Sequence, residues 1–268
     1  MKKMMLVVLA VVASGSVWAA EDKLGVDVDL TWLSKTIWRG IDVGDNKAAF
    51  MPSATFDLWG TGFSTSILGW WSGAESNGSL VNGGGLPTEK YVYMLTYANS
   101  FNKGDAAQVD YNLTYSYNDY YTNPSWYNDY QDLALTVSLP KMCPAGFVPR
   151  YTVAYSWSGR PGPTPGFLGG TELSDAAGFF HMIGLDYNFK LCDQPFTLSA
   201  DAVYNDGAFA IYGPVSDHDW SHITWGLRTA FKVWNGMLIP GIYYQTSMDD
   251  SVNENDEFYT AISYKISF

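Results

Sequence analysis

Apolar and polar residues alternate one by one over long stretches of this sequence. The clearest example is residues 107–118, where Val109, Tyr111, Leu113, Tyr115 and Tyr117 alternate with Gln108, Asp110, Asn112, Thr114, Ser116 and Asn118. Alternation with a period of two predicts a β-strand with one apolar and one polar face. Because the polar face is wet and the other is rich in tyrosine, we expect a strand between water and lipid.

The same pattern recurs about twelve times, and long and short connections follow each other in strict alternation. We expect strands at residues 25–37, 48–59, 63–71, 89–99, 107–118, 129–139, 147–157, 177–190, 196–205, 220–232, 237–246 and 257–268. An even number of antiparallel strands with long loops at one end is typical of bacterial single-chain barrels. The predicted fold is therefore all-β, a closed antiparallel up-and-down transmembrane β-barrel with both termini on the short-turn, periplasmic side.

The last predicted strand runs to the final residue, Phe268, where a soluble domain would more often fray. Phe258, Ile262 and Tyr264 share its apolar face. This strand resembles the closing strand of bacterial outer-membrane barrels, in which a terminal Phe and alternating aromatic residues are read by the insertion machinery. The resemblance implies that Phe268 is an insertion signal and that the barrel-insertion machinery is a partner.

Residues 1–20 read as a secretory signal peptide, with Lys2 and Lys3 before an apolar run and cleavage after Ala19 or Ala20. The rest, 21–268, shows no linker, so we expect one barrel domain in the outer membrane of a Gram-negative bacterium.

The composition narrows the class of protein. The mean hydropathy of −0.08 excludes a helical membrane protein. The formal charge of −12 argues against nucleic acid as a partner. Aromatic residues make up 16% of the chain, which suits interfacial girdles.

Ionisable residues of both signs fall on the polar faces of the predicted strands, where they would point into the lumen. A wet lumen tolerates such charges, whereas a dry core requires that each be paired. We expect Arg150 to pair with Asp186, and Arg228 with Lys232 to lie opposite Asp57 and Asp110. The full set is Asp27, Asp29, Asp57, Asp110, Asp132, Asp186, Asp201, Lys90, Arg150, Lys190, Arg228, Lys232 and Lys265.

Cys143 and Cys192 fall in consecutive short turns on one predicted side. In an oxidising periplasm they predict a disulfide, while the alternative is two free thiols too far apart to bond.

Ser221 and His222 invite comparison with the Ser–His pair of barrel lipid hydrolases, but neighbours in a strand point to opposite faces unless a bulge intervenes. We therefore expect no enzyme activity. No histidine spacing indicates a metal site, and no cofactor is expected.

Acidic residues gather in the predicted loops. They indicate a solvated surface, and they would also suit cation bridges to lipopolysaccharide phosphates or a weak preference for cations. The residues are Asp42, Asp45, Glu75, Asp119, Asp129, Glu172, Asp175, Asp206, Asp217, Asp219, Asp249, Asp250, Glu254 and Asp256. Outer-membrane lipid and lipopolysaccharide are thus the expected surroundings, and small solutes the expected cargo.

Three segments near the N-terminus carry a family resemblance: Thr36-Ile37-Trp38-Arg39-Gly40-Ile41, Asp45-Asn46-Lys47-Ala48-Ala49 and the hairpin 56–71. Together they resemble the TorF-type porin family, whose first strand ends in an aromatic-Arg-Gly motif before a loop and a Gly-centred hairpin. The resemblance covers the first quarter of the chain. It implies an outer-membrane barrel with channel activity and no catalytic residues.

The preferred functional interpretation is a porin-like channel for passive diffusion of small polar solutes or ions through a narrow water-filled lumen. Two alternatives remain from the sequence. One is a barrel lipid hydrolase or acyltransferase with a Ser/His site facing lipid. The other is a structural or adhesive barrel with a plugged lumen. Twelve strands lie between barrels filled by side chains and barrels with wide channels, so the inner side chains decide.

Overall fold

The computed structural model describes residues 24–44, 46–73, 89–121, 129–143, 146–163, 172–209 and 218–268. The expected signal peptide, 1–20, lies outside these residues, as do Asp45, Glu75 and Asp217 of the acidic loops. Within the described residues no helix has the length and apolar character needed to cross a membrane.

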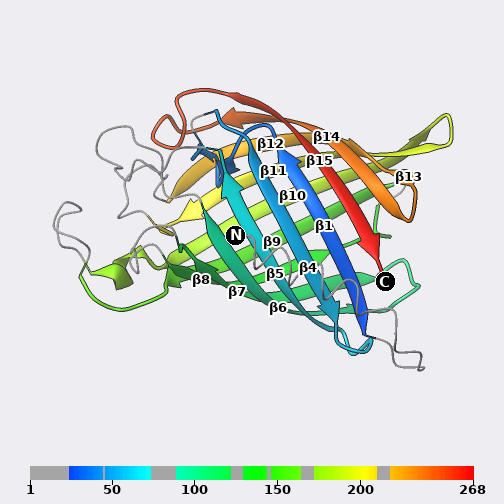
Figure 1. Cartoon of the computed structure of the whole chain (residues 1–268), viewed down its shortest axis with the longest axis horizontal. Coiled ribbons are helices and arrows are strands. Elements are labelled where there is room, and N and C mark those ends of the chain that lie inside the picture. Colours follow the sequence, from blue (N-terminus) through cyan, green and yellow to red (C-terminus); the bar gives the residue numbers. More distant parts are fainter. Residues whose placement is uncertain are drawn as a thin grey trace.

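Twelve long strands in the described residues form one closed antiparallel barrel (Figure 1). Each strand pairs with its neighbours in the chain, and the last pairs with the first, so the fold prediction is confirmed. The strands are β1 Gly25–Leu33, β4 Ala49–Asp57, β5 Phe63–Ser72, β6 Lys90–Phe101, β7 Val109–Asp119, β8 Tyr130–Ser138, β9 Phe147–Ser158, β10 Gly178–Leu191, β11 Gln194–Asp206, β12 Asp219–Thr229, β14 Gly236–Ser247 and β15 Glu257–Ser267.

The seam between β1 and β15 closes the barrel with both backbone and side-chain bonds. Asp29 lies opposite Lys265 in the register, and the Lys265 Nζ lies 2.9 Å from Asp27 Oδ2. The Phe268 amide donates a 2.8 Å hydrogen bond to the Val26 carbonyl. The terminal residue is therefore fixed to the first strand rather than frayed, and the C-terminus lies at the end of the barrel where the short turns gather (Figure 1).

Large apolar side chains cover the outside of the barrel. Leu133 and Leu135 of β8 and Tyr151 and Tyr155 of β9 are each more than a third exposed. Exposed surface of this kind on every strand is unfavourable in water and suits contact with lipid. Trp234, which is 86% exposed, lies in a short turn where an indole ring would meet the membrane interface.

Two segments differ from the sequence prediction. The expected first strand ends at Leu33, and the expected loop that follows contains a small hairpin, β2 Ile37–Trp38 and β3 Ile41–Asp42. The expected strand 220–232 is interrupted at Ala230, so β12 is followed by the short β13 Phe231–Val233. Both β12 and β13 pair with β14, which keeps the barrel continuous across the break.

The disulfide prediction is wrong, because Cys143 and Cys192 are both free. The two residues lie in the β8–β9 and β10–β11 turns, whose centres are separated by two strand spacings, about 10 Å. In addition, β10 continues past Tyr187, its last partner for β9, before it turns at Cys192. A disulfide requires Cα atoms within about 7 Å of each other, so the spacing of the two turns disfavours the bond.

Candidate functional site: the lumen and its mouth

The β2–β3 hairpin has a two-residue tip formed by Arg39 and Gly40. Both tip residues have positive φ, 48° and 89°, as a type I′ turn requires. Gly40 also fits where a larger residue could not, because an added Cβ would lie 2.5 Å from His222 Nδ1 and 2.9 Å from Val252 Cγ1. The left-handed conformation costs Arg39 about 1 kcal/mol, so its contacts must hold it in place.

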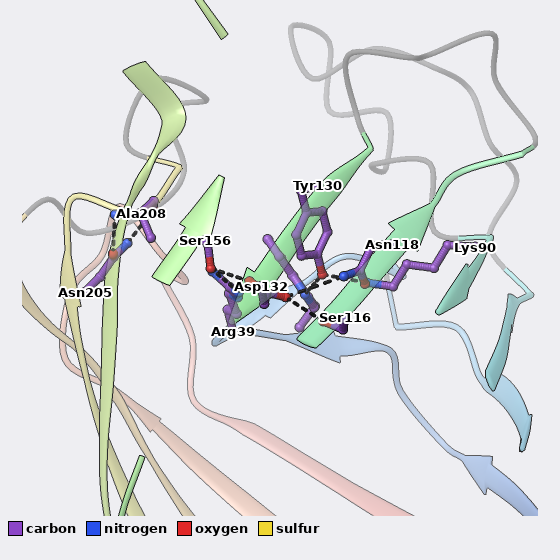
Figure 2. A network of polar contacts seen from close by, with 10 residues as sticks. Arg39, Lys90, Ser116, Asn118, Tyr130, Asp132, Ser156, Asn205 and Ala208 are labelled. Atoms are coloured by element: carbon purple, nitrogen blue, oxygen red, sulfur yellow. Dashed lines mark hydrogen bonds and ion pairs between the residues drawn. The ribbon is translucent and has the colours of Figure 1, made fainter. Parts of the chain in front are cut away.

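Arg39 reaches the opposite side of the barrel. Its Nη2 donates hydrogen bonds to Asp132 Oδ1 at 2.8 Å and to Ser156 Oγ at 3.0 Å. When β1 is counted as the first of the twelve barrel strands, β8 is the sixth and β9 the seventh. Both strands therefore lie across the barrel from the hairpin that follows β1. The face that carries Asp132 and Ser156 is therefore the inner face, and the Arg39–Asp132 ion pair crosses the lumen (Figure 2).

Side chains of β7 and β9, the neighbours of β8, also bind Asp132. Ser156 Oγ of β9 donates a short hydrogen bond to Asp132 Oδ1. Ser116 Oγ and Asn118 Nδ2 of β7 lie 3.4 Å from Asp132 Oδ2 (Figure 2). Three side chains from the two neighbouring strands therefore orient this carboxylate independently of the hairpin.

Aromatic rings enclose the Arg39 guanidinium. Its central carbon lies 4.9 Å from the Phe180 ring centre, 5.0 Å from Phe209, 5.1 Å from Trp38 and 5.7 Å from Tyr130. Each such cation–π contact stabilises the cation by about 0.5–2 kcal/mol, and more when water is excluded. Tyr130 and Phe209 belong to the cluster of buried residues of the fold, and Trp38 packs against it.

Lys90 is a second cation in the same aromatic cluster. The residue is 3% exposed, and its Nζ donates a 2.9 Å hydrogen bond to the Tyr130 hydroxyl. The Nζ also lies 4.8 Å from the Trp70 ring centre and 5.2 Å from that of Tyr120. Burial raises the pKa of Tyr120 above its ordinary value, so this phenol stays neutral beside the ammonium. Among the described residues, no carboxylate lies within ion-pair distance of Lys90.

Residues of β14, of β15 and of the loop between them also hold the hairpin. Gln245 Nε2 of β14 donates a 2.6 Å hydrogen bond to the Gly40 carbonyl, and Asn253 Nδ2 approaches the same oxygen at 3.4 Å. At the base of the hairpin, Lys35 Nζ lies 2.5 Å from Glu257 Oε2. Together with Arg39, these bonds fix the hairpin across the long-loop end of the barrel.

Ser221 and His222 are joined by a hydrogen bond of 2.9 Å between Ser221 Oγ and His222 Nδ1. The sequence argued against this pair unless β12 were bulged. The structure has such an irregularity, because the β11–β12 register shifts between Val203 and Tyr204. Both residues are buried, at 2% and 6% exposure, next to Gly40 of the hairpin. No group of three metal-binding side chains occurs in the described part of the chain.

Deeper in the lumen, Arg150 joins two carboxylates. Its Nη2 lies 2.6 Å from an Asp201 oxygen and its Nε 3.5 Å from Asp186 Oδ2. The three side chains come from β9, β10 and β11 on the inner face. Gly184 makes room for them, because a Cβ there would lie 2.6 Å from Asp201 Oδ1. The expected neighbour Asp186 is present, and Asp201 is the nearer partner.

The other expected lumen charges do not form one site. Asp27 and Lys265 pair at the seam, while the Asp29 carboxylate accepts a hydrogen bond from Thr31. Asp57 binds the Gly60 amide in a short turn. The remaining expected charges, Arg228 of β12, Lys232 of β13 and Lys190 of β10, are exposed, and no ion pair joins them to a carboxylate in the described residues.

A polar chamber opens at the short-turn end, with a volume of about 480 Å³. Asp110, Asn112, Thr136 and Ser138 line its wall, and Lys103 lies at its edge. Ser100 Oγ and Gln108 Nε2 each donate a 2.7 Å hydrogen bond to Asp110. The described lumen thus has an open polar chamber at one end, and the hairpin crosses it at the other.

The contact of Arg39 with the opposite wall does not follow from the sequence prediction, which assigns residues 38–47 to a loop. A signal for a hairpin is present in Ile37-Trp38-Arg39-Gly40-Ile41, where the pair Arg39-Gly40 stands between apolar residues. A Gly-containing pair between apolar residues indicates a two-residue β-turn. An apolar hairpin with an arginine at its tip is better placed inside a barrel than over its rim.

The comparisons with known proteins bear on the fold. No protein-family model matches the chain, and no curated protein matches it. Among solved structures, the NanC porin has a TM-score of 0.54 at 10% identity, over 90% of this chain and 98% of that protein. An outer-membrane channel of Pseudomonas putida F1 has a TM-score of 0.52 at 10% identity, over 95% and 98%. The chain has the fold of outer-membrane channel barrels.

Proposed function

We propose that this protein is a bacterial outer-membrane channel that passes small polar solutes through a water-filled lumen. The observation that carries the proposal is the polar chamber of about 480 Å³ inside the barrel, which is lined by Asp110, Asn112, Thr136 and Ser138. The Asp110 carboxylate and its polar neighbours face this open space although they lie on the inner wall of a closed barrel. A sealed core would exclude water from such groups, whereas a conducting lumen hydrates them.

The β2–β3 hairpin is the part of this channel that controls passage. It crosses the lumen at the mouth, and it is held there by the Arg39–Asp132 pair and the Gln245–Gly40 bond. The TorF-type resemblance belongs to this proposal, because its aromatic-Arg-Gly motif is the tip of the hairpin. Membrane lipid, lipopolysaccharide and the insertion machinery are the proposed partners of the outer surface and of Phe268.

A closed structural barrel is the second candidate, and the hairpin across the mouth is the observation that favours it. The Ser221–His222 pair gives less support to a lipid hydrolase, because both side chains are buried beneath the hairpin and lie on the inner side of the barrel mouth. A lipid-cleaving site would need to be open to the membrane.

Planar-bilayer recording of the purified protein separates these candidates. A channel predicts discrete current steps that report opening of the mouth, while a closed barrel predicts none. Folding is monitored in the same preparation by the mobility shift on heating in detergent. Folded, inserted protein without current in any variant of the hairpin would reject the channel.

A further inference from the structure

The aromatic cluster at the hairpin tip contains two basic side chains and one carboxylate. Arg39 and Lys90 lie over the same two rings, Trp38 and Tyr130, at distances of 5.0 to 5.7 Å. Asp132 is the one carboxylate that the described residues place within 4 Å of either cation. Two neighbouring basic groups therefore share a single counter-charge, and an added anion would favour the charged form of Lys90.

The hydrogen-bonding capacity of these cations is also incompletely used. Arg39 Nη1 is buried and has no hydrogen-bond acceptor among the described residues. An ammonium has three N–H donors, and Lys90 donates one of them to the Tyr130 hydroxyl. Buried cationic donors without acceptors are unfavourable, and oxygen atoms of an anion would satisfy them.

We propose that the mouth recognises small carboxylate solutes with an aromatic or apolar body, and that such a solute opens the channel by taking the place of Asp132 on Arg39. The proposal deepens the channel function and rests on it. The exchange keeps one ion pair on Arg39, so the guanidinium is never left bare while the hairpin leaves the wall. Lys90 provides the second positive charge, and the rings provide a surface for the apolar body of the solute.

Charge excludes the other solute classes from this role. A cationic solute would meet Arg39 and Lys90 together. A neutral solute can stack on the rings but has no charge with which to replace Asp132. A ligand shifts an equilibrium only by its different affinity for the two states, and only an anion gains from the release of Arg39.

The test uses planar bilayers containing the full-length mature protein and three probes with the same ring: sodium benzoate, benzylammonium chloride and benzyl alcohol. Benzoate should raise the open fraction of the wild-type protein by roughly tenfold, and the other two should not change it. An equal response to benzyl alcohol would overturn the proposal, as would the absence of a response to benzoate.

Two variants connect the response to the residues. Asp132→Asn should conduct without benzoate and should gain little from it. Lys90→Met should need roughly tenfold more benzoate for the same response. Asp193→Asn, the same chemical change in the exposed β10–β11 turn, serves as the matched control and should respond like the wild type. A conducting Asp132→Asn variant beside a benzoate-insensitive wild type would reject the solute class alone. Silence of every variant would reject the channel as well.

Discussion

Arg39 and Asp132 are 93 residues apart in the chain and meet at 2.8 Å across the mouth of the barrel. One residue is at the tip of a small hairpin and the other is on a wall strand braced by β7 and β9. The side chains are 15% and 16% exposed, so their ion pair is stronger than a surface pair and weaker than a dry one. A contact of this strength holds the hairpin without making its position permanent.

Asp132→Asn should loosen the hairpin. Removing one partner of a buried ion pair costs about 3–5 kcal/mol, and Ser156 would still hold Arg39, so we expect a loss of about 2 kcal/mol. Hydrogen exchange measured by mass spectrometry should then show roughly 30-fold faster exchange in residues 34–44. Asp193→Asn is the control that should leave this segment protected. Unchanged exchange in folded Asp132→Asn would mean that the ion pair does not hold the hairpin.

Gly40→Ala should prevent the hairpin from seating. The new methyl group would lie 2.5 Å from His222 Nδ1, and the residue has a φ of 89° that alanine adopts at a cost of about 1 kcal/mol. Gly60→Ala is a matched control, because Gly60 has a φ of 66° and no atom within 4 Å of the added carbon. Single-channel recording should show more open time for Gly40→Ala alone. Equal behaviour of the two variants would show that the clash at His222 does not keep the hairpin from seating.

Acid should release the β14–β15 loop, residues 248–256, which places Val252 and Asn253 against Gly40. The Tyr244 hydroxyl donates a 2.6 Å hydrogen bond to Asp256 and the Ser247 amide a 3.0 Å bond, which hold the pKa of that carboxyl below 3.8. A lowered carboxyl pKa stabilises the loop at pH values above the ordinary pKa. This stabilisation is lost as the pH falls through the folded-state pKa.

The open fraction should therefore stay constant from neutral pH down to 3.8, the ordinary pKa of an aspartate, and should rise as the pH falls further and Asp256 becomes protonated. Asp256→Asn removes the titrating group and should show a more mobile loop at neutral pH with little further change in acid. An acid response of the same size in Asp256→Asn would assign the effect to other carboxylates of the mouth.

Arg150→Met should destabilise the barrel, because it leaves Asp186 and Asp201 facing each other without a cation. We expect a loss of about 2–3 kcal/mol after allowance for the wet lumen. The double variant Arg150→Met/Asp201→Asn should recover part of that loss, because it removes one of the two unpaired charges. Urea unfolding in lipid vesicles measures both. Failure of the second substitution to recover stability would show that packing of the arginine stem, not charge, is what was lost.

The barrel could be predicted from the sequence because the alternation of apolar and polar residues in each strand identifies its lipid-facing and its inner face. Alternation in segments such as Gln108–Asn118 depends only on local chain geometry and on the contrast between lipid and water. The even strand count and the alternation of long and short connections then leave one closed topology. For the same reason the inward residues, among them Asp110 and Arg150, could be named in advance.

The mouth could not be predicted in this way. Arg39 contacts Asp132 only because the whole barrel closes and brings the opposite walls within reach. A local sequence pattern carries no information on the distance between those walls. The Ser221–His222 bond likewise depends on a register shift that alternation alone would forbid. The disulfide prediction failed because turns that are neighbours in sequence lie on different hairpins, separated by more than a disulfide can span.

Single-channel recording of wild type and Arg39→Ala under identical conditions tests the central claim most directly. Arg39→Ala removes the contact across the lumen but leaves the wall strands and the lumen charges in place. The account predicts discrete steps from both proteins, with brief and rare openings in the wild type and long ones in Arg39→Ala. Folded Arg39→Ala protein that inserts and stays silent, or that behaves like the wild type, would contradict a channel closed at its mouth by this hairpin.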